Sequence, residues 1–191
     1  MVITDPMDIY LAFEEAEQMP EIHTIVIDTL TFLMDMFESV YVIGSDGFEG
    51  WKQYQQYFKN LMQQYIAKSS KNVIILAHTN TKYNAEEMIK EVSVPIKGAL
   101  KANGVESAFS TVISTKRMAL KDLAKYSSPF LNITEDDEIL GYKYVFQTRL
   151  TKDTINERIR GPVSMWSVNE TFIDNDISFV LQRLKEFYED E

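Results

Sequence analysis

TIVIDT at residues 24–29 and VIILAHT at residues 73–79 are the stretches that decide the fold. Each is an unbroken run of β-branched and aliphatic residues, which is typical of a strand buried on both faces of a parallel sheet. Each run ends in a polar side chain, Asp28 in the first and His78 in the second. Because the carboxyl ends of parallel strands meet at one edge of a sheet, we expect Asp28 and His78 to lie near one another.

Apolar residues at helical spacing predict helices around these strands, over residues 9–18, 30–37 and 51–66. The helix that Trp51 opens has an aromatic stripe, which we interpret as core. Its members are Trp51, Tyr54, Phe58, Leu61, Met62, Tyr65 and Ile66. A polar loop is expected from Asn80 to Gly104.

The last third of the chain is predicted to be richer in strands. Residues 108–115 and 143–150 have strand-like composition, and the chain ends in an amphipathic helix that Asp174 or Asn175 can cap. The pattern as a whole predicts an α/β fold with three layers and a mostly parallel sheet, a β-rich C-terminal portion and a terminal amphipathic helix. We expect residues 1–191 to form a single domain.

The composition excludes several classes of protein. The chain has no cysteine and two histidines, so disulfides and zinc sites built on thiolates are excluded. The sequence shows neither a secretory signal nor an apolar run long enough for a membrane span, which predicts a cytoplasmic protein without a membrane partner. The net charge of −10 argues against a surface-wide nucleic-acid clamp, so any contact with nucleic acid should be local.

The end of the first strand has the pattern of a magnesium ligand. Four apolar residues lead to Asp28, and the hydroxyl residue Thr29 follows. This is the Walker B pattern, in which the carboxylate holds the Mg²⁺ ion shared with the phosphates of ATP. The pattern has limited specificity, because many buried strands end in an aspartate that caps the next helix.

These motifs, with Trp51 opening a helix, PIKG at residues 95–98 and QTR at residues 147–149, resemble the RecA-like P-loop ATPases encoded by tailed phages. The resemblance extends over nearly the whole chain and includes ATPases of single-strand annealing and recombination. It implies a RecA-like core, ATP and Mg²⁺ as cofactors provided that a P-loop is supplied, and either a homo-oligomer or a complementing P-loop polypeptide. The implied role is ATP-dependent recombination or replication of DNA in the cytoplasm of the infected host cell.

The resemblance also implies roles for individual residues. Asp28 would be the metal ligand with Thr29 beside it in the nucleotide site, and His78 would be the sensor of the γ-phosphate. The alternative for His78 is a structural histidine bonded to a loop carbonyl. One member of a basic group would act in trans on the nucleotide of a neighbouring subunit. That group is Arg149, Lys152, Arg158 and Arg160.

The segment from Asn80 to Gly104 corresponds to a mobile loop that can face DNA in the resembled family, and single-stranded DNA is the partner that this implies. It carries Lys82, Lys90, Lys97 and Lys101. These lysines are opposed by Glu86, Glu87, Glu91 and Glu106. A solvated surface loop is therefore the alternative to a DNA-binding one.

The sequence lacks the motif that cradles ATP phosphates. None of its seven glycines belongs to a Gly-x-x-x-x-Gly-Lys-Ser/Thr pattern, and the catalytic glutamate of such cores would precede Met1. We therefore expect the downstream part of a split or truncated ATPase, completed by a separate P-loop polypeptide, by neighbouring subunits, or not at all. The chain alone is not expected to hydrolyse ATP. The alternatives are a non-catalytic RecA-fold binding or assembly subunit, and an unrelated α/β protein in which Asp28 and His78 are structural.

Overall fold

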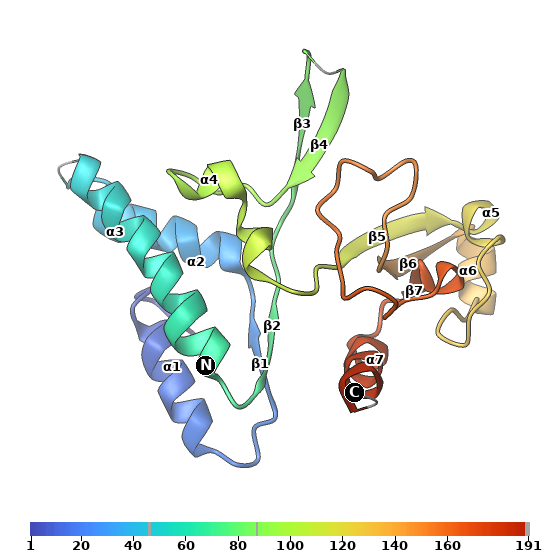
Figure 1. Cartoon of the computed structure of the whole chain (residues 1–191), viewed down its shortest axis with the longest axis horizontal. Helices are drawn as coiled ribbons and strands as arrows, with labels where there is room; N and C mark the ends of the chain where they lie inside the picture. The colour runs from blue at the N-terminus through green and yellow to red at the C-terminus, as the bar shows by residue number, and fades with distance from the viewer. Residues whose placement is uncertain (46, 87, 190–191) are drawn as a thin grey trace. The chain divides into compact units, whose positions relative to one another are not determined.

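The computed structural model describes residues 1–45, 47–86 and 88–189 and forms two compact units (Figure 1). Unit 1 comprises Met1–Lys82 and Val92–Ala108, and unit 2 comprises Tyr83–Glu91 and Phe109–Glu191. Each unit has a core of its own. The prediction that Glu87 opposes the loop lysines lies outside the described residues. The expectation of one ATPase core over the whole chain stays a prediction.

Unit 1 alternates helices with two short strands. Its elements are α1 (Asp8–Gln18), β1 (Thr24–Ile27), α2 (Leu30–Phe37), a π-helical turn (Glu38–Val42), α3 (Gly47–Asn60), a second π-helical turn (Leu61–Tyr65), a 3₁₀ turn (Ile66–Lys68), β2 (Asn72–Ile75), α4 (Leu100–Asn103) and a 3₁₀ turn (Val105–Ala108). The three predicted helices are thus present.

The core of unit 1 lies among its helices. Phe13 of α1, Leu30 of α2 and Leu61 after α3 are each at most 2% exposed. Within this core the rings of Phe37 and Tyr57 stack with centroids 4.4 Å apart. The predicted aromatic stripe is confirmed as core at Tyr54, Phe58, Leu61 and Met62, all of which are buried.

The sheet of unit 1 has two strands. β1 and β2 run parallel with Thr24 opposite Asn72 and Ile27 opposite Ile75. Among the described residues no other strand pairs with either of them. Val26 is 56% exposed, so the prediction of burial on both faces is wrong. The physical reason is that the layers and strands expected around these two are not supplied by the described residues.

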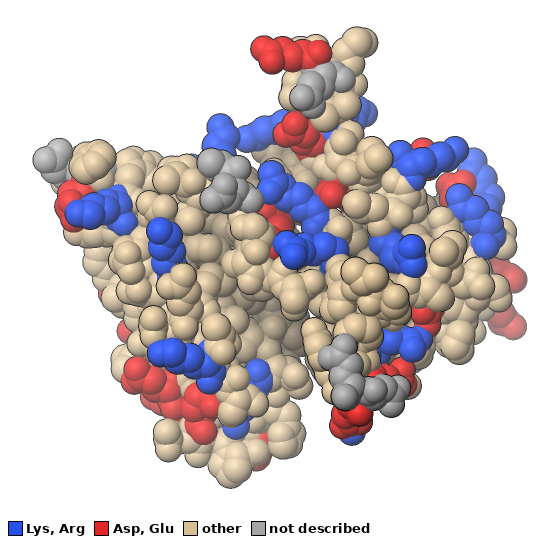
Figure 2. All heavy atoms as spheres, viewed as in Figure 1, with Lys and Arg blue, Asp and Glu red and all other residues tan. Residues whose placement is uncertain are grey.

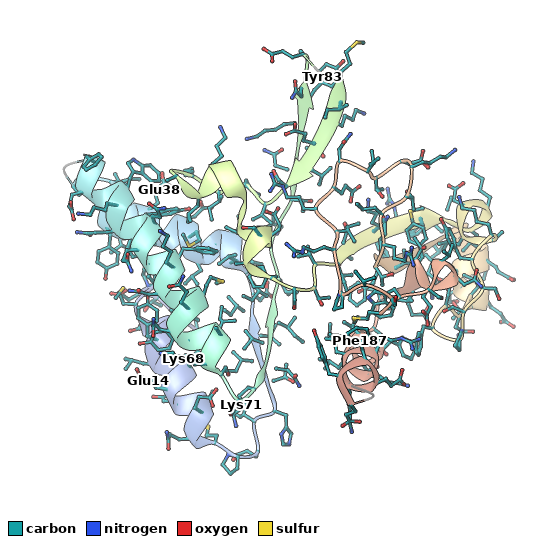
Figure 3. The ribbon with its side chains drawn as sticks, viewed as in Figure 1. Glu14, Glu38, Lys68, Lys71, Tyr83 and Phe187 are labelled. Atoms are coloured by element: carbon teal, nitrogen blue, oxygen red, sulfur yellow. The ribbon has the colours of Figure 1, made fainter. Side chains whose placement is uncertain are left out.

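The polar segment after β2 forms a hairpin and a short helix where a loop was expected. β3 (Asn80–Asn84) pairs with β4 (Ile89–Ser93), and Figure 3 labels Tyr83 on this hairpin. The Asn84 side chain reaches Glu91 across it at 3.4 Å. Glu106, expected to oppose the lysines, is instead buried, and its carboxylate accepts the Val94 N–H at 2.7 Å.

Unit 2 is built on an antiparallel sheet of three strands in the order β5-β6-β7. Its elements are β5 (Ser114–Ala119), α5 (Leu120–Leu123), α6 (Glu135–Leu140), β6 (Tyr142–Gln147), a 3₁₀ turn (Val168–Glu170), β7 (Phe172–Asp174) and α7 (Ile177–Glu189). The strand predicted at 143–150 is present as β6 with shifted bounds, but the strand predicted at 108–115 shares only its last two residues with β5, and β7 was not predicted. With this sheet, the described strands are mostly antiparallel, which corrects the expected mostly parallel sheet.

The terminal helix α7 is confirmed as amphipathic and packs on the sheet of unit 2. Val180 is 4% exposed and belongs to a cluster with Trp166 and Ile173, against which Phe187 also packs (Figure 3). The predicted caps are wrong, because Asp176 accepts the Ser178 N–H at 2.9 Å while Asp174 accepts the Asn132 N–H. None of the described helices is long and apolar enough to cross a membrane.

Candidate functional site

The carboxyl ends of β1 and β2 lie at the same level of the unit 1 sheet. Ile27 and Ile75, the last residues of the two strands, are register partners. Asp28 therefore follows β1 on the same edge where Leu76, Ala77 and His78 follow β2. The strand order does not separate Asp28 from His78, which disfavours the reading of an unrelated α/β protein.

Hydrogen bonds join these two strand ends to the start of α2. The Leu76 N–H donates to the Ile27 carbonyl at 3.0 Å, and the Leu76 carbonyl accepts the Leu30 N–H at 2.8 Å. In the first turn of α2, the Thr31 hydroxyl accepts the His78 N–H at 3.0 Å. The backbone positions of Asp28 and His78 are thus fixed by a shared network. Sequence reasoning assigned no role to Thr31, although its place three residues after the strand-end aspartate puts it on the first turn of the helix.

Thr29 begins α2. Its backbone is extended, and its hydroxyl accepts the Phe32 N–H at 3.2 Å, so it is the N-cap of the helix. The peptide bond between Asp28 and Thr29 is cis. The Thr29 hydroxyl, which we expected in the nucleotide site, therefore already accepts a hydrogen bond within the protein.

The side chains of Asp28 and His78 are both exposed, and within the described part of the chain neither makes a side-chain hydrogen bond or ion pair. An exposed carboxylate without an intramolecular partner is available to a metal ion, since Mg²⁺ often takes one or two protein carboxylates and completes its shell with water and phosphate. The described residues contain no cluster of three or more potential metal-ligating side chains.

The four basic candidates belong to unit 2 and fall into two pairs. Arg149 and Lys152 line one cavity, and the Arg149 guanidinium donates to the Trp166 carbonyl at 2.6 Å. Arg158 and Arg160 are not among the residues lining it. Arg160 is exposed, and its backbone forms a bridge with Val112. Figure 2 shows basic side chains on the visible face of unit 2, interspersed with acidic ones.

The three lysines proposed for nucleic acid differ in their surroundings. Lys82 lies on β3 and is exposed. Lys101 lies on α4 and is also exposed. Lys97, by contrast, pairs with Glu38 at 2.5 Å, and this hydrogen bond raises the pKa of its ammonium (Figure 3). Sequence reasoning did not single out Tyr83, which is 60% exposed beside Lys82.

Comparison with known proteins identifies the family. The family model described as AAA domain, a P-loop NTPase family, matches residues 3–150. No curated protein and no solved structure matches the chain. The match spans more than half of the 191 residues and includes both strand ends described above. The chain therefore belongs to the AAA domain family of P-loop ATPases, whose members bind ATP with Mg²⁺.

Proposed function

We propose that this AAA domain is the Walker B and sensor portion of a RecA-like ATPase of phage type that acts in DNA recombination or replication. The observation that carries the proposal is the shared edge of β1 and β2, where Asp28 and His78 follow neighbouring strands of the family-matched region. The protein would work in the cytoplasm of the infected host cell.

In this proposal Asp28 holds the Mg²⁺ ion of bound ATP, and the His78 imidazole donates a hydrogen bond to a γ-phosphate oxygen. The hydrogen bonds between the two strand ends and the start of α2 hold the backbone of both residues in place. Such fixed positions matter because phosphoryl transfer is catalysed mainly by positioning and by charge. A cation acting in trans would stabilise charge on the transferred group, and the candidates are Arg149, Lys152, Arg158 and Arg160.

The cradle for the ATP phosphates would come from outside these 191 residues, because they contain no Gly-x-x-x-x-Gly-Lys-Ser/Thr motif. We propose that a complementing P-loop polypeptide or a neighbouring subunit of a homo-oligomer supplies it. The unpaired outer edges of β1 and β2 within the described chain support this proposal, since exposed strand edges are normally paired or covered.

The hairpin β3–β4 is the proposed contact with single-stranded DNA. Lys82 and Lys90 are exposed on it, and neither is in an ion pair with a described residue. Tyr83 is the exposed aromatic residue on which a base would stack, worth about 1–3 kcal/mol per base. Lys101 on α4 is a separate candidate for contact with DNA, whereas the pairing of Lys97 with Glu38 makes Lys97 the weakest candidate.

The second candidate function is a non-catalytic subunit that binds or assembles with other proteins. The absence of a P-loop motif from these 191 residues favours it. The two candidate functions differ in their response to ATP, because an assembly subunit can work without binding Mg-ATP.

ATP turnover tests the proposal. The chain is assayed alone and with the polypeptide encoded immediately upstream, using Asp28→Asn, His78→Ala and the exposed control Asp136→Asn. We expect turnover only in the mixture, a loss of about 100-fold or more for Asp28→Asn, and no change for the control. Robust hydrolysis by the isolated chain, or equal rates for Asp28→Asn and Asp136→Asn, contradicts the proposal. Mixtures without turnover in which the two polypeptides still bind each other favour the assembly subunit.

A further inference from the structure

Unit 2 contains a cavity of about 580 Å³, within the range of small-molecule sites. All its lining residues belong to unit 2 and come from β5, the segment around α5, the end of β6 and the segment after it, and the residues around β7. Met118, Tyr126 and Phe172 give it an apolar wall. The cavity is therefore formed within one unit of one chain.

Basic side chains reach this cavity from three separate segments. Lys116 comes from β5, Lys125 follows α5, and Arg149 and Lys152 follow β6. The Lys116 ammonium is already paired with Glu157. The other three make no ion pair with a described residue, and they are opposed in the lining by two acids, Asp122 and Asp153. The cavity thus carries a local excess of positive charge in a chain whose net charge is −10.

Two of these cations are held in place. The Arg149 guanidinium donates to the Trp166 carbonyl at 2.6 Å, which leaves its other N–H groups for a ligand. The Lys125 ammonium lies 5.2 Å from the centroid of the Tyr126 ring. A guanidinium fixed in this way matches the oxygens of a phosphate in a bidentate geometry without further loss of side-chain freedom.

A buried amide marks the floor of the same cavity. Gln147 is 0% exposed and lines it. Its amide nitrogen donates to the Arg149 carbonyl at 2.7 Å and to the Thr154 hydroxyl at 2.8 Å. Its Oε1 atom accepts no hydrogen bond from any described residue. Because buried polar atoms are nearly always paired, an unpaired acceptor at this position points to a donor supplied from outside the chain.

We propose that this cavity binds a phosphate-bearing ligand, with Lys125, Arg149 and Lys152 contacting the phosphate. The apolar wall takes the base or sugar, and an N–H or O–H of the ligand approaches the Gln147 amide. The phosphate comes either from a free nucleotide or from a nucleic-acid strand. This site shares no residue with Asp28 and His78, and with Arg149 and Lys152 assigned to it, Arg158 and Arg160 remain as the candidates for action in trans.

Binding of two probes in EDTA tests the site, because the proposed contacts need no metal ion. The probes are radiolabelled ATP and a fluorescent oligothymidylate, measured on the full chain by equilibrium dialysis and anisotropy. Lys125→Glu and Lys152→Glu reverse exposed charges at the cavity, and Lys121→Glu reverses an exposed charge on α5 that does not line it. We expect each cavity variant to weaken binding of at least one probe by about tenfold or more, and Lys121→Glu by less than about twofold.

The outcomes separate this site from the proposed ATPase site. Tighter binding of ATP would identify the ligand as a free nucleotide, and tighter binding of the oligonucleotide would identify it as a nucleic-acid strand. Either result supports the site when the variants respond as stated. Absence of binding of both probes overturns the proposal, as does an equal effect of Lys121→Glu. Asp136→Asn, an exposed change outside the cavity lining, should leave binding unchanged in EDTA, so a loss in that variant also overturns it. Because no P-loop partner or hydrolysis is needed, failure of the proposed ATPase function leaves this result interpretable.

Discussion

The sheet of unit 1 and the sheet of unit 2 differ in how they cover apolar residues. β1 and β2 have the more apolar sequences, TIVI and NVII, yet Val26 is 56% exposed and only Ile27 of the eight residues is buried. β6 and β7 read YKYVFQ and FID, and in them Val145 and Ile173 are 0% exposed. Apolarity thus does not decide which of the two sheets is better covered.

The supply of neighbouring layers explains the difference. In unit 2 Phe130, the residues around Trp166 and Val180 of α7 cover Ile173 from within the described chain. In unit 1 the helices pack mainly on one another, and the parallel pair has no described strand beyond either edge. A strand with the composition of a sheet centre but the exposure of an edge is what the proposed completion of the sheet by a P-loop polypeptide or a neighbouring subunit would explain.

Truncation of an apolar side chain in each sheet gives the largest contrast. We expect Ile173→Ala to lower the free energy of unfolding of unit 2 by about 2–5 kcal/mol, because it leaves a cavity in a closed core. Val26→Ala should cost less than about 1 kcal/mol, since much of that side chain already contacts water. The two tryptophans report the units separately in urea titrations, Trp51 for unit 1 and Trp166 for unit 2.

Trp51→Phe and Trp166→Phe backgrounds serve as controls, because each leaves a single fluorescent reporter. Equal costs for Ile173→Ala and Val26→Ala would show that β1 is covered as well as β7, and the contrast between the sheets would be lost. A P-loop polypeptide that completes the sheet should raise the cost of Val26→Ala, which would sharpen the contrast.

The ion pairs of the two units provide the next contrast. In unit 2 the Arg183 guanidinium pairs with Glu170 and lies 5.0 Å from the Phe130 ring centroid, and the Glu170 side chain is 9% exposed. Arg183→Met should therefore destabilise unit 2 by about 1–3 kcal/mol, because a largely buried carboxylate loses its partner. In unit 1 the Lys97 side chain is 56% exposed, so Lys97→Met should cost less than about 1 kcal/mol.

Chemical denaturation at two salt concentrations checks this pair of variants. The Lys97–Glu38 contribution should fall in 1 M salt, since exposed charges are screened, while the Arg183 contribution should change less. A Lys97→Met variant as destabilised as Arg183→Met would contradict the contrast.

How far the sequence predicts this molecule depends on the range of the interactions involved. β1, β2, the buried face of α3 and the terminal helix follow from local periodicity, and the shared edge of Asp28 and His78 follows from the parallel pairing. β7 was missed because three residues carry almost no periodic signal. The hairpin β3–β4 was missed because its polar sequence predicts a loop.

The candidate site was predictable in its backbone placement and not in its side-chain partners. The pairing of Lys97 with Glu38 joins residues 59 positions apart, which no local pattern reveals. The cavity of unit 2 assembles Lys125, Arg149 and Lys152 through the packing of three segments. In the sequence, only the short separation of Arg149 and Lys152 indicated that these two cavity residues share a surface.

Helix caps test whether the two units are equally dependent on local contacts. Thr29 caps α2 in unit 1, and Thr134 forms a capping box with Asp137 at the start of α6 in unit 2. Alanine at either position should cost about 1 kcal/mol, because one backbone N–H loses its acceptor. Serine at either position should restore most of the stability. Thr29→Ala without a stability change would favour a ligand role for its hydroxyl, measured as altered Mg-ATP binding in the completed complex.

The smallest effect concerns the polar contacts that connect α1 to the turn before β2. The Ser69 and Ser70 hydroxyls donate to Glu17 at 2.5 and 2.6 Å, and these bonds lower the pKa of the Glu17 carboxyl. A carboxyl whose pKa is lower in the folded state stabilises that state above its unfolded pKa, about 4.3, and loses this contribution as the pH falls through the folded value. Glu17→Gln should therefore lower the urea midpoint of unit 1 at pH 7, and the gap to the wild type should close toward pH 3.

Glu15→Gln, on the same helix and exposed, should show no such closing gap. A gap for Glu17→Gln that is constant from pH 7 to pH 3 would mean that the contact acts through shape and not through charge. Unit 1 would then depend on packing at this end of its sheet, as unit 2 does, and the difference between the two sheets would be confined to their exposed faces and edges.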